Sequence, residues 1–346
     1  MTPDRAIQIA DQGYFWVGVE LADSEHGRFV DGTQMYVEYQ IPARQTQPYP
    51  LVMIHGGGGQ GLDWMSTPDG RPGWRTLALQ RGYAVYVIDR PGHGRARANV
   101  PSARTPMVPT VEGLGTHFAG GHNPLHTQWP GTGLPDDPTV ANFLASAAHG
   151  IPDFPSHHRL MCRRGGELLD HIGPAILVAN SAGCAAAWLM ADARPSKVKS
   201  IVAIEPLGPS MPWGITASPM TYDPPARCPE ELGLIQLRPS SPSEVEADKG
   251  RKAPSLPPGP AAQRQPEPAR RLANLSDIPI AVVTGEASFG NSLDPATVEY
   301  LRQAGCAVEH IELGMHGLCG NGHLPMLEQN NHEVLDVVLA WLERHQ

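Results

Sequence analysis

Apolar residues fall into short unbroken runs that are separated by segments with helical spacing. Such runs are typical of strands covered on both faces of a parallel sheet. We expect these strands at 50–55, 83–88, 175–178, 199–206, 280–284 and 308–313, and helices at 72–81, 139–148, 157–171, 294–304 and 332–344. Two earlier segments, 14–21 and 35–41, predict strands at an antiparallel edge of the same sheet. The alternation predicts an α/β fold, with a mostly parallel sheet and helices on both faces.

The length of the chain predicts one large domain with insertions. The 346 residues, of which 41% are hydrophobic, are enough for a single core, so we take 1–346 as one domain. The alternating pattern stops at 96–155, where prolines and glycines are frequent, and we expect a lid or pocket wall there. A second proline-rich insertion is expected at 207–270.

Charge and composition exclude some classes of partner. A formal charge of −9 argues against nucleic acid and anionic membranes. No segment is long and apolar enough to span a bilayer. The start, Met1–Ala6, shows no basic segment followed by an apolar run, so we expect a cytoplasmic protein. The 5 cysteines have irregular spacing that fits neither a disulfide framework nor a zinc motif, and we expect no metal or other cofactor.

A serine stands between one of the apolar runs and a helical run of small residues. The sequence Ala179-Asn-Ser-Ala-Gly183 follows the run at 175–178 and precedes the run at 184–192. This order predicts a strand, a sharp turn with Ser181 at its apex, and a helix. The strained turn of a nucleophilic serine requires small residues two positions away, and Gly183 and Ala179 meet this requirement. The alternative is a buried serine on an ordinary connection.

A glycine-rich segment, His55–Gly61, follows the apolar run at 50–55. No Gly-Lys-Ser/Thr follows and the dinucleotide-binding spacing is absent, so a phosphate loop is disfavoured. Glycines let a backbone approach a reacting carbonyl group and direct N–H groups at it. We therefore expect an oxyanion loop, with a flexible turn as the alternative.

A serine nucleophile needs a base, and the base needs an orienting acid. His316 and His323 lie between the last strand and the last helix, and His323 is favoured because it is nearer to that helix. For the acid, Glu286 and Asp294 follow the strand at 280–284, and Glu205 ends the strand after the serine. These residues all follow strand ends, where the sites of parallel sheets form.

The chain as a whole resembles the α/β-hydrolases, and among them a small group of bacterial serine esterases whose acid is a glutamate after the sixth strand. The matching motifs occur in the same order, at Gln34–Pro42, Ile54–Gly56, Thr67–Gly70, Tyr86–Asp89, Pro138–Asn142, Val202–Pro206 and Gly320–His323. The resemblance implies Ser181 as nucleophile, His323 as base and Glu205 as acid. It also implies N–H donors at Gly57 and Ala182, and a homodimer.

The resemblance implies hydrolysis of small carboxylic esters through an acyl-enzyme intermediate. A lactonase, an amidase or an acyltransferase would use the same residues, and a non-catalytic binding protein could share the fold. A metallohydrolase is disfavoured because the 15 histidines show no metal-binding spacing. The chain departs from the related esterase at Gly57 and Gly58, where adjacent cysteines stand in that enzyme. Without a bridge there, we expect a more mobile oxyanion loop.

Overall fold

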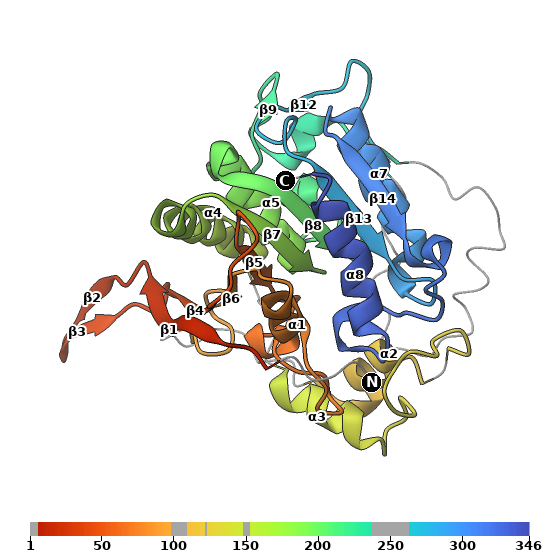
Figure 1. Cartoon of the computed structure of the whole chain (residues 1–346). Helices are drawn as coiled ribbons and strands as arrows, with labels where there is room; N and C mark the ends of the chain where they lie inside the picture. Colours follow the sequence, from red (N-terminus) through yellow and green to blue (C-terminus); the bar gives the residue numbers. More distant parts are fainter. Residues whose placement is uncertain (1–5, 98–108, 122, 148–152, 237–262, 346) are drawn as a thin grey trace.

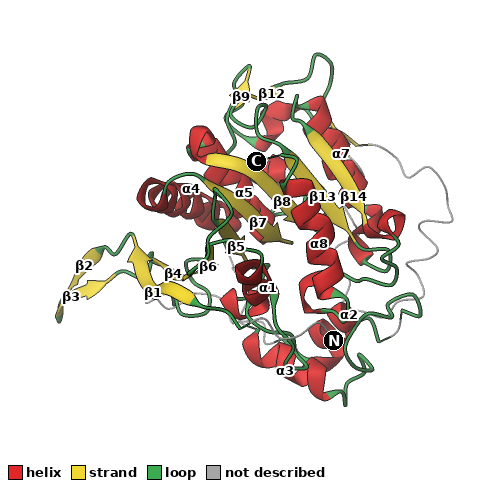
Figure 2. Ribbon diagram, in the orientation of Figure 1, coloured by secondary structure: helices red, strands yellow, loops and turns green. Residues whose placement is uncertain are grey.

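The computed structural model describes residues 6–97, 109–121, 123–147, 153–236 and 263–345, and it is built around one twisted sheet (Figures 1 and 2). The 8 strands are arranged in the order β1-β4-β6-β5-β7-β8-β13-β14. Their bounds are β1 (Ile9–Val17), β4 (Met35–Pro42), β5 (Leu51–Ile54), β6 (Val85–Asp89), β7 (Ala175–Asn180), β8 (Val198–Ile204), β13 (Ile280–Thr284) and β14 (Val308–Glu312). The pairs β1–β4 and β4–β6 are antiparallel and the others are parallel, which confirms the predicted sheet.

Helices cover both faces of the sheet, as the sequence predicted. They are α1 (Trp74–Gln80), α2 (Thr116–Ala119), α3 (Pro138–Ser146), α4 (Phe154–Ile172), α5 (Gly183–Ala193), α7 (Asp294–Gln303) and α8 (Asn331–Leu342). One apolar core joins α4, α5 and α7 to one face of the sheet, and a second core joins α1 and α8 to the other. Along β5, Val52 and Ile54 enter the first core while Leu51 and Met53 enter the second, as the two-residue period of a strand requires.

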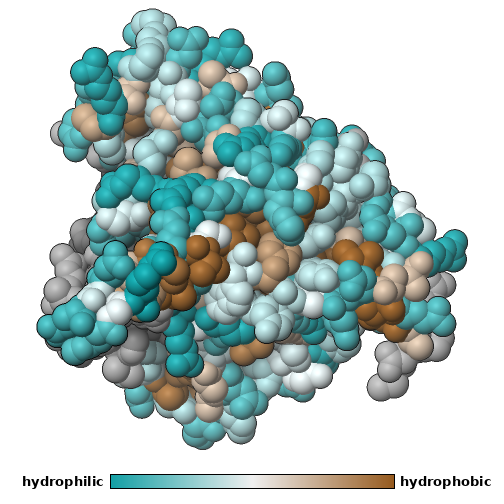
Figure 3. Space-filling model, turned by 90° about the vertical axis from the view of Figure 1, so that its left-hand side faces the viewer, coloured by the Kyte–Doolittle hydropathy of each residue, from teal (hydrophilic) through white to brown (hydrophobic). Residues whose placement is uncertain are grey.

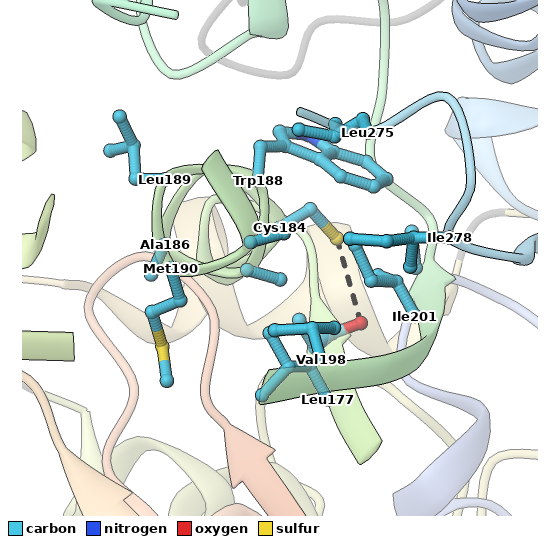
Figure 4. Close-up of a cluster of buried hydrophobic side chains, with 14 of the residues drawn as sticks. Leu177, Cys184, Ala186, Trp188, Leu189, Met190, Val198, Ile201, Leu275 and Ile278 are labelled. Atoms are coloured by element: carbon cyan, nitrogen blue, oxygen red, sulfur yellow. Dashed lines mark hydrogen bonds between the residues drawn. The ribbon is translucent and has the colours of Figure 1, made fainter. Parts of the chain in front are cut away.

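Helix α5 packs closely on the sheet because its first half consists of small residues. A Cβ atom added at Gly183 would lie 2.3 Å from the carbonyl oxygen of His55, so the helix begins almost in contact with the end of β5. Further along α5, Trp188 fills the space beside Cys184, Leu275 and Ile278 (Figure 4). This packing fixes the start of α5, and therefore the turn that precedes it, against the sheet.

The first predicted strand, 14–21, is shifted in the structure. Strand β1 ends at Val17 because the chain turns at Gly18, whose φ of 67° lies in the left-handed region that favours glycine. A hairpin that the sequence analysis missed follows, formed by β2 (Leu21–Ser24) and β3 (Gly27–Val30). The hairpin projects from the body of the molecule (Figure 1). Figure 3 views this side and shows apolar patches on an otherwise hydrophilic surface.

Short paired strands occur in the described part of the insertion at 207–270 and directly after it, where β12 lies. Strand β9 (Tyr222–Asp223) pairs with β12 (Arg271–Leu272), and β10 (Ile235–Gln236) pairs with β11 (Gln263–Arg264). The proline-rich centre of this insertion, 237–262, lies outside the described residues.

Candidate active site

Ser181 stands at the apex of the turn between β7 and α5. Its φ of 51° is one of three positive values at non-glycine positions in the described part of the chain. The turn is held by backbone bonds, since the Ser181 N–H donates to Ile204 O at 2.9 Å and its carbonyl accepts from the Cys184 N–H at 2.9 Å. A backbone in this region costs energy and persists only where the surroundings enforce it. The strained turn expected from the sequence is therefore present.

The glycine loop after β5 lies directly on the serine turn. A Cβ atom at Gly56 would be 3.3 Å from Ser181 Cβ, and one at Gly57 would be 3.4 Å from Ala182 Cβ. Residues 56–59 line one pocket together with Ser181 and His323. The two residues expected to donate N–H groups, Gly57 and Ala182, are thus neighbours beside the serine.

His323 lies in the same pocket and is almost completely buried. Its imidazole packs against the rings of Phe289 and Phe118, with centroid distances of 4.4 Å and 5.3 Å. Burial lowers the pKa of His323 to about 3, so the ring is neutral. Neither ring nitrogen has a hydrogen-bond partner within the described structure. His316, the other histidine considered, is exposed at the end of the 3₁₀ turn Leu313–His316 and does not line this pocket.

Glu205 follows β8, is completely buried and has a φ of 53°. Its Oε2 lies 3.5 Å from His323 Nδ1. The same carboxylate accepts hydrogen bonds from the Gly285 N–H at 2.6 Å and from the Ser288 hydroxyl at 2.5 Å. Burial raises the pKa of Glu205 to about 8, and these two donors act in the opposite direction because they favour the charged form.

The other two candidate acids lie elsewhere. Glu286 is exposed, and its Oε2 accepts from the Gly320 N–H at 3.0 Å. Asp294 is completely buried, and its carboxyl group accepts from the Leu207 N–H at 2.7 Å and from the Thr284 hydroxyl at 2.8 Å. Burial and the charge of Glu205 hold the pKa of Asp294 well above its usual range. Of the three acids, Glu205 is the one in contact with His323.

Sequence reasoning missed a second buried glutamate that orders the histidine loop. Glu328 accepts from the Gly322 N–H at 2.8 Å, from Asn321 Nδ2 at 2.7 Å and from His126 Nε2 at 2.7 Å. A charged residue directly after the apolar run 324–327 was the available signal. Its partner His126 is 202 positions away in the chain, so no local pattern could reveal the pair.

The described part of the insertion at 96–155 contributes to the pocket. Phe118 and Phe143 line it, next to Leu324. The N–H groups of Thr127 and Gln128 both donate to Gly320 O, at 3.1 Å and 3.2 Å, and so attach the insertion to the histidine loop. The pocket therefore has an aromatic and mainly apolar wall on this side.

Two further findings concern metals and membranes. Among the described residues, no group of three or more histidine, cysteine or acidic side chains has the arrangement of a metal site. None of the helices in the described ranges is long and apolar enough to cross a bilayer.

Comparisons with known proteins show the family and the fold of the chain. The model of the "Alpha/beta hydrolase family" matches residues 51–337. A protein of Fungal sp. (strain ATCC 74256), named "Probable secreted lipase phiG", is 36% identical over 348 residues, which cover 96% of this chain and 89% of that protein. A solved structure described as "The Atomic Resolution Structure of a Novel Bacterial Esterase" superimposes with a TM-score of 0.67 at 22% identity, over 100% of this chain and 99% of that one.

One sequence-based expectation is overturned by these comparisons. The fungal relative, which matches almost the whole chain, is named as a secreted protein, so the expected cytoplasmic location is wrong. That expectation depended on finding no signal peptide, and a signal peptide is removed from mature secreted proteins. The sheet order, the serine turn and the extent of the family match lead to one conclusion: this chain is a hydrolase and belongs to the alpha/beta hydrolase family.

Proposed function

We propose that this hydrolase cleaves carboxylic esters through an acyl-enzyme intermediate on Ser181. The observation that carries the proposal is the shared pocket. Ser181 sits on a strained turn beside the Gly57 and Ala182 backbone, and a neutral buried His323 with Glu205 behind it lines the same cavity. The relatives named as lipase and esterase support ester substrates.

In the proposed reaction, Ser181 Oγ attacks the ester carbonyl carbon while His323 Nε2 takes the hydroxyl proton. The carbonyl oxygen becomes an anion, and the N–H groups of Gly57 and Ala182 stabilise it, each by about 2.7–4 kcal/mol in barrier terms. The charge that forms on the imidazole favours the ionised form of Glu205, and Nδ1–H is donated to that carboxylate across the present separation of 3.5 Å. The alcohol leaves with the proton from His323, and water then releases the acid by the same steps.

The pocket wall favours substrates with an apolar group next to the ester. Phe118, Phe143 and Leu324 offer apolar surface close to Ser181. We propose that the insertion at 96–155 acts as this wall and forms one domain with the rest of the chain. Lactones, amides and acyl transfer to alcohols would use the same groups, and the lipase name of the fungal relative favours esters.

The test is hydrolysis of nitrophenyl esters, matched anilides and lactones by wild type and three variants. We expect ester turnover in wild type and its loss in Ser181→Ala. Glu205→Gln should lower kcat by about 10⁴-fold, as in other triads in which the acid is replaced by its amide. Glu286→Gln, which alters an exposed carboxyl group away from His323, is the matched control and should stay active.

Each contrary result has a defined meaning. Turnover that survives in Ser181→Ala contradicts the mechanism. If Glu286→Gln loses turnover and Glu205→Gln stays active, the catalytic acid is Glu286 after β13, and the proposed role of Glu205 after β8 is wrong. A folded wild type that binds esters without cleaving them favours the binding-protein alternative.

A further inference from the structure

The carbonyl group of Gly56 is held by residues that do not line the pocket. Its oxygen accepts from Arg90 Nη2 at 2.6 Å and from His55 Nδ1 at 2.9 Å, and more distantly from the Gly59 N–H of the loop itself at 3.4 Å. In a trans peptide the C=O and N–H groups point in opposite directions. The bonds to the Gly56 carbonyl therefore turn the Gly57 N–H away from Arg90, toward the pocket that Gly57 shares with Ser181.

The protonation of His55 fits this arrangement. Its Nε2 accepts from the Arg90 backbone N–H at 3.1 Å, so the single ring proton is on Nδ1, which donates to Gly56 O. Burial and the charge of Arg90 hold the pKa of His55 well below its usual range, so the ring stays neutral. The Nε2 atom of His93 lies 3.4 Å from the same Arg90 Nη2 that donates to Gly56 O.

Arg90 is an unusual cation to find inside a protein. Only 2% of its surface is exposed, and no carboxylate in the described structure forms a salt bridge with it. Burial lowers its pKa to about 10, so it remains charged at neutral pH. A buried charge without a salt bridge is costly. The carboxyl group of Asp63 lies near enough to favour the charge of Arg90, and the shortest hydrogen bond of the guanidinium is to the Gly56 carbonyl.

The loop needs an anchor of this kind. Residues 56–59 are all glycine, so they have no side chains to hold their peptide groups, and glycine peptides rotate readily. We infer that Arg90 is a positioning residue for the oxyanion hole, which together with His55 fixes the Gly56–Gly57 peptide so that the Gly57 N–H faces the developing oxyanion. This inference rests on the proposed function and explains how the loop is ordered without a disulfide.

The test compares an oxygen ester with the matching thionoester, whose C=S group becomes a sulfur anion. Sulfur accepts hydrogen bonds weakly, so a well-formed oxyanion hole favours the oxygen ester. In Arg90→Met, which removes the donor, kcat for the oxygen ester should fall about 10²-fold with KM little changed. The kcat for the thionoester should fall much less, so the ratio of kcat for the oxygen ester to kcat for the thionoester falls. Arg90→Lys keeps a charged donor and should recover part of the ratio.

Arg95→Gln is the matched control, because Arg95 lies in the same turn but pairs with Asp89 and Glu38 instead of Gly56. The Arg95→Gln variant should have a lower free energy of unfolding and an unchanged ratio of kcat for the oxygen ester to kcat for the thionoester. Arg90→Met should keep the thermal midpoint, since an apolar side chain replaces a buried charge. The inference is overturned if wild type hydrolyses esters and neither folded Arg90 variant changes the ratio. If wild type hydrolyses no ester, the proposed function fails and the inference fails with it.

Discussion

The carboxyl groups of Glu205 and Asp294 are both buried near His323, and ionisation of either group lowers the free energy of unfolding. Both pKa values are raised above those of the unfolded chain, which lie near 4. For an acid shifted in this direction, the stabilising contribution is complete below pH 4 and is lost as pH rises toward the folded pKa, about 8 for Glu205. The free energy of unfolding should therefore fall between pH 5 and pH 8.

Asp294→Asn should make that fall shallower. The asparagine keeps an oxygen for the Leu207 N–H and an amide for Thr284, and it removes one of the two acids and the repulsion between them. Urea unfolding of wild type and variant at pH 5 and pH 8 measures the difference. An equal loss in the two proteins would show that Asp294 has an ordinary pKa in the folded state.

At the residue scale, local patterns revealed some groups of the site and concealed others. The backbone strain at Ser181 followed from a strand, a small-residue turn and a helix in direct succession. The residues alone left the acid open among Glu205, Glu286 and Asp294, because all of them follow strand ends. Arg90 went unnoticed because its partner, the carbonyl of Gly56, lies 34 positions earlier and a backbone oxygen leaves no mark in a sequence.

At the scale of elements, the contact between β5 and α5 sets the geometry of the site. A Cβ atom at Gly183 would lie 2.3 Å from His55 O and 2.9 Å from Ile54 O, and backbone atoms cannot move aside as a flexible side chain can. Gly183→Ala should therefore push α5 away from β5, with a loss of about 1–3 kcal/mol in the free energy of unfolding. Ester turnover should fall as well, because the serine turn moves relative to Gly57.

Gly314→Ala is the matched control for this substitution. A Cβ atom there would meet only Glu286 Cβ at 4.0 Å, which is ordinary contact. We expect a change within about 0.5 kcal/mol and normal turnover, as for most surface substitutions. Chemical denaturation and nitrophenyl ester kinetics on the two variants make the comparison, and equal effects would contradict the close contact at Gly183.

Burial decided how well the sequence predicted an element. Buried strands such as β13 and amphipathic helices such as α8 were predicted to within a few residues, since burial leaves an apolar run or an apolar periodicity in the sequence. The hairpin of β2 and β3 was missed because its strands have 4 residues each and are mostly exposed, so burial left no pattern. The pairs β9–β12 and β10–β11, of 2 residues a strand, leave even less.

At the scale of the whole molecule, alternation of strands and helices predicts a parallel sheet but leaves the order of its strands open. In the sheet, β6 lies between β4 and β5, and β5 lies beside β7, so the spatial order differs from the order in the chain. This order depends on contacts between distant segments, which the sequence of a single segment does not show. The resemblance to the α/β-hydrolases predicted the fold and its mostly parallel sheet, which the structure confirms, and the order of the strands comes from the structure. The sequence could not show which residues of the insertions reach the pocket, because contacts such as His126 with Glu328 join distant segments.

We propose that the protein forms a homodimer through the edge of β1 and the adjacent hairpin. Strand β1 lies at one edge of the sheet and β14 at the other, and an exposed edge strand readily pairs with a second copy about a two-fold axis. Apolar side chains of this region are exposed, among them Val19 and Leu21, which are 53% and 52% accessible. Such a surface is more stable when it is covered.

The double variant Val19→Glu, Leu21→Glu places charges in the proposed contact and should dissociate the dimer. Light scattering should give twice the 37.2 kDa chain mass for wild type and the single chain mass for this variant. Leu125→Glu is the matched control, since Leu125 is 59% exposed but lies in the insertion beside the pocket, and this variant should stay dimeric. A monomeric wild type at high concentration, or a double variant that stays dimeric, would contradict this contact. Ester turnover should persist in the monomer, because every group of the proposed site comes from one chain.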